Sequence, residues 1–554
     1  MLTRHGKSHG FVVVASLLGL AGVVGASPCD PATFSFPSSI LGAEHVRTTA
    51  AVVRNYTGLG RFRPDPTVVI PPEGVNPFCN VTVSYTHPGH DDTVNVHVWL
   101  PLDKGEWNER FMGTGGGGFA AGDVDGDYPS KAVQAGYVAA ATDAGHLVTE
   151  GVDSWSLKAP GNVNWPLLFN FAYRSLHELA VVGKHVTREY YGQEAKFSYW
   201  RGCSTGGRQG LAVAQRYPGD FDGVLSMCPA VDLPALSAVL YYPQMVMNEA
   251  KWWPEKCELE AVVEAAVEAC DGTDGRKDGI IGRLSKCEFE VEKVLGRKFK
   301  CEGRESRVHE KTVEVVKKVM RGLEDEEGKV MFPGYVPGAP FTGMFALMNS
   351  VCEGEDRGKC KGIPFNVGEA WIRLFVFKDP TFDPTSVTLQ QFRDAFRLGV
   401  EQYDSILASS HDLRGFKNRG GKLLMWHGVA DQVVTVLAGR NFYERAKKLD
   451  RERGVVTKDY WRYFEVPGVN HCSSMTGAPF PWDAMDNLRK WVEEGVAPEV
   501  LHARKVEDKD GKKTLGEESR TICLWPEEGV WDGKGWKCVP PGDKVAVETG
   551  HGEL

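Results

Sequence analysis

The chain has 554 residues, of which 42% are hydrophobic and 25% charged, and 64 basic against 73 acidic residues give a formal net charge of −9. This balance argues against a nucleic-acid-binding protein, which would carry a basic stripe. A single hydrophobic core does not need a chain of this length, so one large domain with a second unit is expected. Thirteen cysteines without the close Cys/His spacing of a zinc site indicate disulfides, and their odd number leaves at least one thiol free or paired with another chain.

The N-terminus has the pattern of a signal peptide. A basic segment precedes an apolar run, residues 11–24, and small residues follow up to Ala26. The run is shorter than the roughly 20 apolar residues that span a bilayer. The pattern therefore predicts a signal peptide over residues 1–26 and an exported protein without a membrane anchor. In an exported chain, the Asn-x-Thr triplets beginning at Asn55 and Asn80 are candidate glycosylation sites.

Between residues 94 and 230 the pattern alternates between strand and helix. Period-two or short apolar runs predict strands, and apolar residues spaced three and four apart predict helices. Such alternation implies a mainly parallel sheet with helices on both faces. The expected strands are 94–100, 110–112, 137–141 and 197–200, and the expected helices are 168–186 and 207–215.

The middle of the chain has a different character. Residues 231–400 are richer in charge, glycine and proline, with a helix expected at 310–323. The strand pattern resumes at residues 421–427 and again at 463–466. The sequence therefore predicts a sheet-bearing core in two parts, 27–230 and 401–554, with an inserted lid of residues 231–400.

A Gly-x-Ser-x-Gly motif centred on Ser204 lies between an expected strand and an expected helix. In that context the serine sits on a sharp turn, and the flanking glycines let the strand and helix pass closely. The five-residue pattern alone also occurs by chance, but the strand and helix supply the required setting. The motif predicts a nucleophile at Ser204.

Two further residues complete a candidate triad. Asp431 and His471 each follow an expected strand, and the order serine, aspartate, histidine is that of the α/β-hydrolase fold. His471 would accept the serine proton, and Asp431 would orient the imidazole. Each residue alone could be a turn or loop residue, but the joint order favours catalysis. His427 is the competing base, although its place on the strand favours a structural role beneath the acid loop.

A glycine-rich loop, residues 113–118, follows an early strand. A flexible connector or a phosphate loop would also be rich in glycine, but a phosphate loop needs a following Lys-Ser/Thr, which is absent. In α/β-hydrolases this loop supplies one oxyanion donor and the residue after the nucleophile the other. The expected donors are the amides of Thr205 and of Gly116 or Gly117.

Cys203 and Cys472 each adjoin a proposed catalytic residue. A disulfide requires Cα atoms roughly 4.4–6.8 Å apart. Since Ser204 and His471 must approach within hydrogen-bond reach, their neighbours are expected at such a separation. The adjacency predicts a Cys203–Cys472 disulfide that holds the histidine loop against the nucleophile turn.

The Cys-Ser, Asp and His-Cys elements together resemble the tannase and feruloyl esterase family. The resemblance covers nearly the whole mature chain, and the segments 79–87, 141–145 and 523–526 are more similar to fungal tannases than to feruloyl esterases. It implies hydrolysis of esters of plant phenolic acids, with galloyl esters preferred and feruloyl esters as the alternative. A catalytically idle polyphenol-binding module is the alternative from another class. A homodimer is compatible with the resemblance.

The resemblance also implies a structural calcium ion in the lid. An acidic Asp-Gly loop, residues 271–280, matches the family site, and a hard cation prefers several oxygens from a tight loop. A metal-free acidic turn is the alternative. The implied ligands are the carboxylates of Asp271, Asp274 and Asp278 and the carbonyls of Arg276 and Ile280.

Three more disulfides are plausible beside this resemblance. One would close the acidic loop, and the others lie near the two ends of the mature chain. Five cysteines remain without an assigned partner: Cys228, Cys257, Cys301, Cys352 and Cys360. The plausible pairs are Cys270–Cys287, Cys29–Cys79 and Cys523–Cys538.

Overall fold

The computed structural model describes Met1 and residues 28–57, 70–71, 73–122, 126–146, 151–352, 360–475, 477–509 and 512–541. Apart from Met1, the expected signal peptide over residues 1–26 lies outside these ranges. Among the described residues, none of the helices combines the length and the apolar character needed to cross a membrane.

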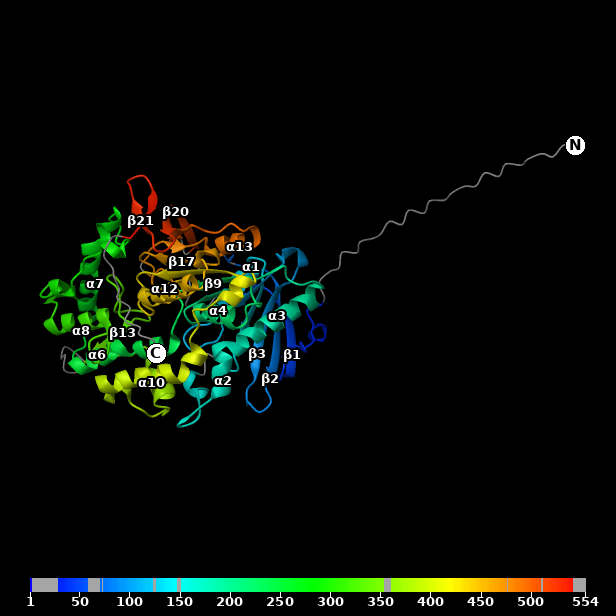
Figure 1. Cartoon of the computed structure of the whole chain (residues 1–554), viewed down its shortest axis with the longest axis horizontal. Helices are drawn as coiled ribbons and strands as arrows, with labels where there is room; N and C mark the ends of the chain where they lie inside the picture. Colours follow the sequence, from blue (N-terminus) through cyan, green and yellow to red (C-terminus); the bar gives the residue numbers. More distant parts are fainter. Residues whose placement is uncertain are drawn as a thin grey trace.

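A nine-stranded mixed sheet forms the centre of the protein (Figure 1). Along the sheet from β1 through β2 and β3 to β5, each strand is antiparallel to its neighbour. From β5 to β17 neighbouring strands are parallel. The six strands expected from the sequence are therefore confirmed, and three strands that the sequence analysis did not expect join them: two at the antiparallel edge, and residues 223–227 within the parallel part. In spatial order they are β1 (Glu44–Val53), β2 (Phe78–Thr86), β3 (Val94–Pro101), β5 (Val138–Thr142), β4 (Arg110–Thr114), β8 (Phe197–Cys203), β9 (Gly223–Met227), β16 (Lys422–Gly428) and β17 (Trp461–Val466).

Side chains alternate between the two faces of the sheet along each strand, and in the parallel part both faces are buried, whereas the edge strand β1 is mostly exposed. In β16, Leu423 and Met425 belong to one hydrophobic core, and Leu424 and Trp426 to the other. Helices supply the facing apolar residues of each core. The first core contains residues of α3 (Ser175–Tyr191), α4 (Thr205–Arg216) and α12 (Val436–Glu452), and the second contains residues of α1 (Asp127–Gln134) and α13 (Ala484–Glu494).

Two expected helices differ from the sequence pattern. The helix expected at 168–186 is interrupted by a π-helical turn, Asn170–Arg174, between α2 (Trp165–Phe169) and α3. The buried Asn170 there donates a hydrogen bond to Asp92, a contact that spacing of apolar residues does not reveal. The helix expected at 310–323 ends earlier, as α8 (Glu310–Arg321), because Gly322 adopts φ +99° and starts a strand.

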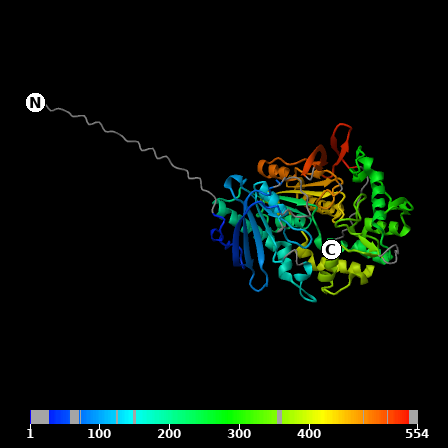
Figure 2. The same ribbon diagram turned by 180° about the vertical axis from the view of Figure 1, so that it is seen from behind.

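The chain between β9 and β16 adds no strand to the nine-stranded sheet among its described residues, and the expected lid lies within it. Several of its helices contribute to the first hydrophobic core, so the core continues from the sheet into this segment. The helices of this segment are α5 (Leu233–Val239), α6 (Tyr242–Ala250), α7 (Lys256–Cys270), α8, α9 (Asn366–Ala370), α10 (Leu389–Leu407) and α11 (Arg414–Asn418). Figures 1 and 2 show α6, α7 and α8 on the opposite side of the molecule from β1–β3.

Short strands complete the structure. In the lid, β10 pairs with β11, β12 with β13 and β14 with β15, each as a two-stranded antiparallel sheet. After β17 the chain forms a three-stranded sheet and a terminal hairpin. These strands are β10 (Lys298–Cys301), β11 (Arg304–Arg307), β12 (Gly322–Glu324), β13 (Val330–Pro333), β14 (Ser350–Cys352), β15 (Cys360–Gly362), β18 (Phe480–Pro481), β19 (Val500–Lys509), β20 (Lys512–Cys523), β21 (Glu528–Trp531) and β22 (Trp536–Val539).

Candidate active site

Ser204 occupies the turn between β8 and α4 with φ 62° and ψ −125°, a conformation that L-residues rarely adopt. The turn is tight: a Cβ atom at Gly202 would lie 2.4 Å from the carbonyl carbon of Gly206. Only glycine therefore fits at this position. The turn places Ser204 at the N-terminal end of α4, where the first amides have no acceptor within the helix.

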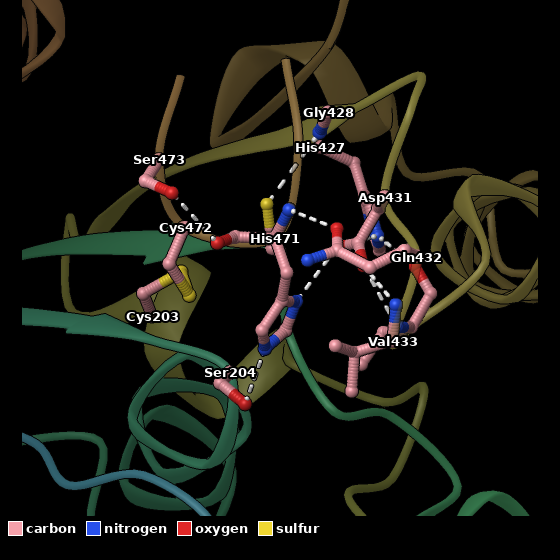
Figure 3. The surroundings of a disulfide bond; sticks show 12 residues. Cys203, Ser204, His427, Gly428, Asp431, Gln432, Val433, His471, Cys472 and Ser473 are labelled. Atoms are coloured by element: carbon pink, nitrogen blue, oxygen red, sulfur yellow. Dashed lines mark hydrogen bonds and ion pairs between the residues drawn. A yellow bond between two sulfur atoms is a disulfide. The ribbon is translucent and has the colours of Figure 1, made fainter. Parts of the chain in front are cut away.

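The loops after β16 and β17 bring the other two predicted residues to this serine (Figure 3). His471 Nε2 lies 2.9 Å from Ser204 Oγ, and its Nδ1 lies 2.8 Å from Asp431 Oδ2. The carboxylate can only accept, so Nδ1 carries the proton and Nε2 is free to accept from the Ser204 hydroxyl. The three side chains form one hydrogen-bonded chain that ends at Ser204.

Asp431 is buried and held as a carboxylate. Its Oδ1 accepts hydrogen bonds from the amides of Val433 and Val434, both at 2.8 Å. Burial alone would raise the pKa of Asp431, but the charges and hydrogen bonds of His471 and His427 outweigh it and hold the pKa well below its usual range. Asp431 is therefore ionised at any pH at which the triad could operate.

His427 has the structural place that the sequence favoured. Its Nε2–H donates to the carbonyl of Val434 at 2.8 Å, and the same nitrogen lies 3.3 Å from Asp431 Oδ2. The ring is fully buried beneath the loop that carries Asp431. His427 thus supports Asp431, and His471 is the histidine that contacts Ser204.

The disulfide predicted between Cys203 and Cys472 is present, with its Cα atoms 5.9 Å apart. The three pairs suggested beside the family resemblance are present as well. Two further bridges, unassigned from the sequence, lie in the lid: Cys257–Cys301 and Cys352–Cys360. Cys228 is the free cysteine among the described residues, and it is buried.

Cys228 lies against the triad. Its Sγ accepts a hydrogen bond from the amide of Gly428 at 3.5 Å. Burial raises the pKa of this thiol well above its ordinary value, and the charge of Asp431 raises it further. The thiol is therefore protonated and serves as packing beside the acid.

The glycine-rich loop is fixed to the start of α4. The amide of Gly206 donates to the carbonyl of Gly116 at 3.0 Å, and the Thr205 hydroxyl donates to the carbonyl of Gly118 at 2.7 Å. Thr205 is the first residue of α4, so its amide has no acceptor within the helix. The loop and the helix N-terminus thus meet beside Ser204.

One of the two expected loop donors is engaged elsewhere. The amide of Gly116 donates to Gln209 Oε1 at 3.1 Å, and the Gln209 amide group in turn donates to the carbonyl of Ala121 at 2.8 Å. The expectation that left Gly116 and Gly117 equivalent is corrected, because a side chain inside α4 takes the Gly116 amide. Within the described part of the chain, the Gly117 amide has no partner and is the better candidate donor.

The acidic loop in the lid lies between Cys270 and Cys287, which are joined. Asp271 Oδ1 accepts hydrogen bonds from three amides, those of Asp278, Gly279 and Ile280, at 2.9–3.1 Å. These bonds curl the loop around the Asp271 carboxylate. The implied ligands therefore all belong to one closed turn.

The charges in this turn are incompletely balanced. Arg520 contacts the carboxylates of both Asp274 and Asp278. Asp278 Oδ1 is nevertheless buried with no hydrogen-bond partner among the described residues. Burial raises the pKa of Asp278, and the charges of Asp274 and Asp271 raise it further against the opposing arginines. The orphaned carboxylate oxygen in an oxygen-rich turn is the feature that would suit a hard cation, but the carboxylates of Asp271, Asp274 and Asp278 do not gather within 4.8 Å of one another.

The two candidate glycosylation sites differ in exposure. Asn55 is exposed in the segment after β1. Asn80 lies within β2, between β1 and β3, and its side-chain oxygen is buried without a partner in the described structure. The geometry leaves Asn55 the more accessible acceptor.

Sequence reasoning missed two buried glutamines at the site. Gln209 holds the glycine loop, and Gln432 accepts a hydrogen bond from the His471 amide at 3.0 Å. Gln209 belongs to the motif around Ser204 and could have been singled out from it. Gln432 had no signal beyond its position next to Asp431.

Comparison with known proteins agrees with this geometry. A family model described as tannase and feruloyl esterase matches residues 79–539. A protein of Arthroderma benhamiae named probable feruloyl esterase is 38% identical over 493 residues, covering 88% of this chain and 89% of that protein. Tannase of Aspergillus oryzae is 28% identical over 525 residues, covering 85% of this chain and 86% of that protein. The solved structure of tannin acyl hydrolase from Aspergillus niger matches with a TM-score of 0.81 and 27% identity, covering 92% of this chain and 94% of that chain. This chain therefore belongs to the tannase and feruloyl esterase family, and it is a carboxylic ester hydrolase with an α/β-hydrolase fold.

Proposed function

We propose that this enzyme hydrolyses esters of plant phenolic acids through an acyl intermediate on Ser204. The observation that carries the proposal is the hydrogen-bonded chain from Ser204 through His471 to the buried Asp431. In the first step His471 Nε2 takes the hydroxyl proton while Ser204 Oγ bonds to the ester carbonyl carbon. Asp431 stabilises the imidazolium that forms.

The remaining steps return the enzyme to its starting state. The carbonyl oxygen becomes an oxyanion, for which the amides of Thr205 and Gly117 are the proposed donors. The ester C–O bond then breaks, and His471 gives its proton to the departing alcohol. Water repeats the sequence on the acyl-enzyme and releases the phenolic acid, with the serine proton restored.

Galloyl esters are the proposed preferred substrates, with feruloyl esters as the second candidate. The galloyl reading is supported by the tannase-like segments at 79–87, 141–145 and 523–526 and by the similarity to the tannin acyl hydrolase structure. The feruloyl reading is supported by the 38% identity to a probable feruloyl esterase. Specificity constants on methyl gallate and methyl ferulate decide between them. A preference for ferulate of tenfold or more, about 1.4 kcal/mol in transition-state binding, would overturn the first.

An idle polyphenol-binding module is tested on the same substrates. Ser204→Ala should lower kcat by at least about four orders of magnitude and leave the fold intact. Its circular dichroism spectrum and melting temperature control for folding. Equal hydrolysis rates for the variant and the parent protein would contradict the acyl-enzyme mechanism.

The acidic lid loop is proposed to bind calcium through the carboxylates of Asp271, Asp274 and Asp278 and the carbonyls of Arg276 and Ile280. The support is the orphaned Asp278 Oδ1 within a cystine-closed turn of oxygen ligands. The ion would hold the lid and would take no part in acyl transfer.

The mature protein is proposed to be secreted after loss of residues 1–26, with a glycan at the exposed Asn55 and, less accessibly, at Asn80. The N-terminal pattern and the disulfides support export, because such bridges persist in oxidising compartments. N-terminal sequencing and intact mass of protein recovered from the culture medium test both points. Light scattering of the same sample decides whether the mature chain forms a homodimer.

A further inference from the structure

Gln432 is the residue that joins the catalytic histidine to the lid. It follows Asp431 and is 2% exposed. Its Oε1 accepts the His471 amide at 3.0 Å (Figure 3), and its Nε2 donates to the carbonyl of Met344 at 3.0 Å. A single side chain thus spans the loop that follows β17 and the segment of the lid between β13 and β14.

The lid segment that Gln432 reaches, residues 343–349, is a closed loop. Gly343 and Asn349 hold it shut through two reciprocal hydrogen bonds of 3.0 and 2.9 Å. At its tip Met344 and Phe345 are 56% and 38% exposed, and Phe345 adopts φ 62°. A hydrogen-bonded loop with exposed apolar side chains is therefore connected to the backbone of His471 through Gln432.

The loop after β16, which carries Asp431, has other contacts with the lid, but these do not reach His471. Tyr335 donates to the carbonyl of Val433 at 2.9 Å, and Thr435 donates to the carbonyl of Gly334 at 2.7 Å. These bonds join the lid to the core at their interface. Gln432 adds to this interface a direct hydrogen bond to the backbone of His471.

We propose that Gln432 is a positioning residue that keeps His471 in register with the lid loop 343–349. The inference rests on the proposed role of His471 as the base. Without the glutamine, the buried His471 amide and the Met344 carbonyl both lose their partners, and the histidine loop can shift. A displacement of about 1 Å at a catalytic group can cost roughly a hundredfold in rate.

The lid provides a matched control. Gln244, on α6, is also 2% exposed, and its Nε2 lies 3.1–3.2 Å from three carbonyls, those of Leu347, Asn349 and Ile363. Gln244→Met therefore removes the same kind of anchor from the same loop without touching His471. Gln432→Met removes the anchor and the contact to the base together.

The test compares kcat, KM and melting temperature of the two variants on methyl gallate and methyl ferulate. Both variants should melt a few degrees lower, but only Gln432→Met should lose kcat, by about 10- to 100-fold. Gln432→Met with kcat within twofold of the parent, or an equal kcat loss in Gln244→Met, would overturn the proposal. Ser204→Ala is measured in parallel. If Ser204→Ala is inactive while Gln432→Met keeps its kcat, the positioning role of Gln432 fails and the acyl-enzyme mechanism stands.

Gln432→Glu provides a second, pH-dependent readout and serves if Gln432→Met fails to fold. A protonated carboxyl can accept from the His471 amide and donate to the Met344 carbonyl, whereas a carboxylate cannot donate. The ratio of its kcat/KM to that of the parent should therefore rise as the pH falls. A ratio that is flat or falls toward low pH would contradict the bridging role.

Discussion

The Cα atoms of Cys203 and Cys472 lie 5.9 Å apart across a disulfide, directly beside the 2.9 Å contact between Ser204 and His471. The bridge joins residues 269 positions apart in the chain. It therefore fixes the histidine loop to the nucleophile turn, and the two halves of the core to each other across the lid insertion.

Removal of this disulfide should reduce both stability and turnover. In the chain-entropy model, closing so long a loop contributes about 5 kcal/mol, although measured bridges often give less. Cys203→Ala with Cys472→Ala is expected to express poorly, and the folded fraction should have a much lower kcat. Circular dichroism melting and turnover of purified folded protein measure the two effects.

The Cys352–Cys360 bridge is the control, since it closes only eight positions of a lid hairpin. Its double alanine variant should keep kcat within about twofold. Near-parental turnover and melting temperature in the Cys203/Cys472 variant would show that the bridge next to the triad is incidental.

Buried His87, which lies far from Ser204 in the sequence, should make the free energy of unfolding depend on pH. Burial alone would lower the pKa of His87, but hydrogen bonds to Asp92 and Glu178 at 2.7 and 2.9 Å outweigh it and raise the pKa to about 9. Arg174 faces Asp92 at 3.5 Å, and Tyr85 donates to Glu178 at 2.7 Å. The rise from the ordinary value of about 6.5 corresponds to roughly 3 kcal/mol.

Because the folded pKa is raised, this contribution is fully present below about pH 6.5 and is lost as the pH rises through about 9. His87→Gln should therefore cost more unfolding free energy at pH 6 than at pH 9.5, as measured by urea denaturation. His502→Gln is the control, because the His502 side chain is 48% exposed beside Asp483. A loss in His87→Gln that is equal at both pH values would contradict the ionised pair.

Much of the site could be predicted from the sequence because its signals are local. Ser204, Asp431 and His471 each follow a strand. The cysteines next to Ser204 and His471 indicate that these two residues lie close together. The Gly116 and Gly117 donors could not be separated, since the distinction depends on Gln209 one helical turn into α4.

Features that depend on distant packing could not be predicted. The Cys257–Cys301 and Cys352–Cys360 pairs are set by how the lid folds, and no motif marks them. The π-helical turn begins at Asn170, whose side chain donates a hydrogen bond to Asp92, 78 positions away. Gln432 carries no pattern at all, because its role comes from two loops that meet only in the folded protein.

Chelation should lower the melting temperature and leave low-temperature turnover largely unchanged. Calcium binding to the folded lid alone would contribute about 3 kcal/mol at a free concentration one hundred times Kd. Elemental analysis of protein never exposed to chelator should find calcium, and Asp278→Asn should abolish the chelator response. Asp325→Asn is the control, since Asp325 only caps an exposed lid turn.

Absence of calcium together with a melting temperature that EDTA does not change would contradict the metal site. Arg520 would then be the group that neutralises Asp274 and Asp278. In that case Arg520→Gln should destabilise the protein strongly, because it would leave the buried carboxylate of Asp274 without its paired cation.

The covalent role of Ser204 is tested most directly by labelling with diethyl p-nitrophenyl phosphate, followed by peptide mapping. The acyl-transfer mechanism predicts one diethylphosphoryl group per chain, located on Ser204, with hydrolysis of methyl gallate and methyl ferulate lost in proportion to labelling. Ser204→Ala should take up no label and show no activity. Stoichiometric labelling at another residue, or an inactivated enzyme with Ser204 unmodified, would contradict the account.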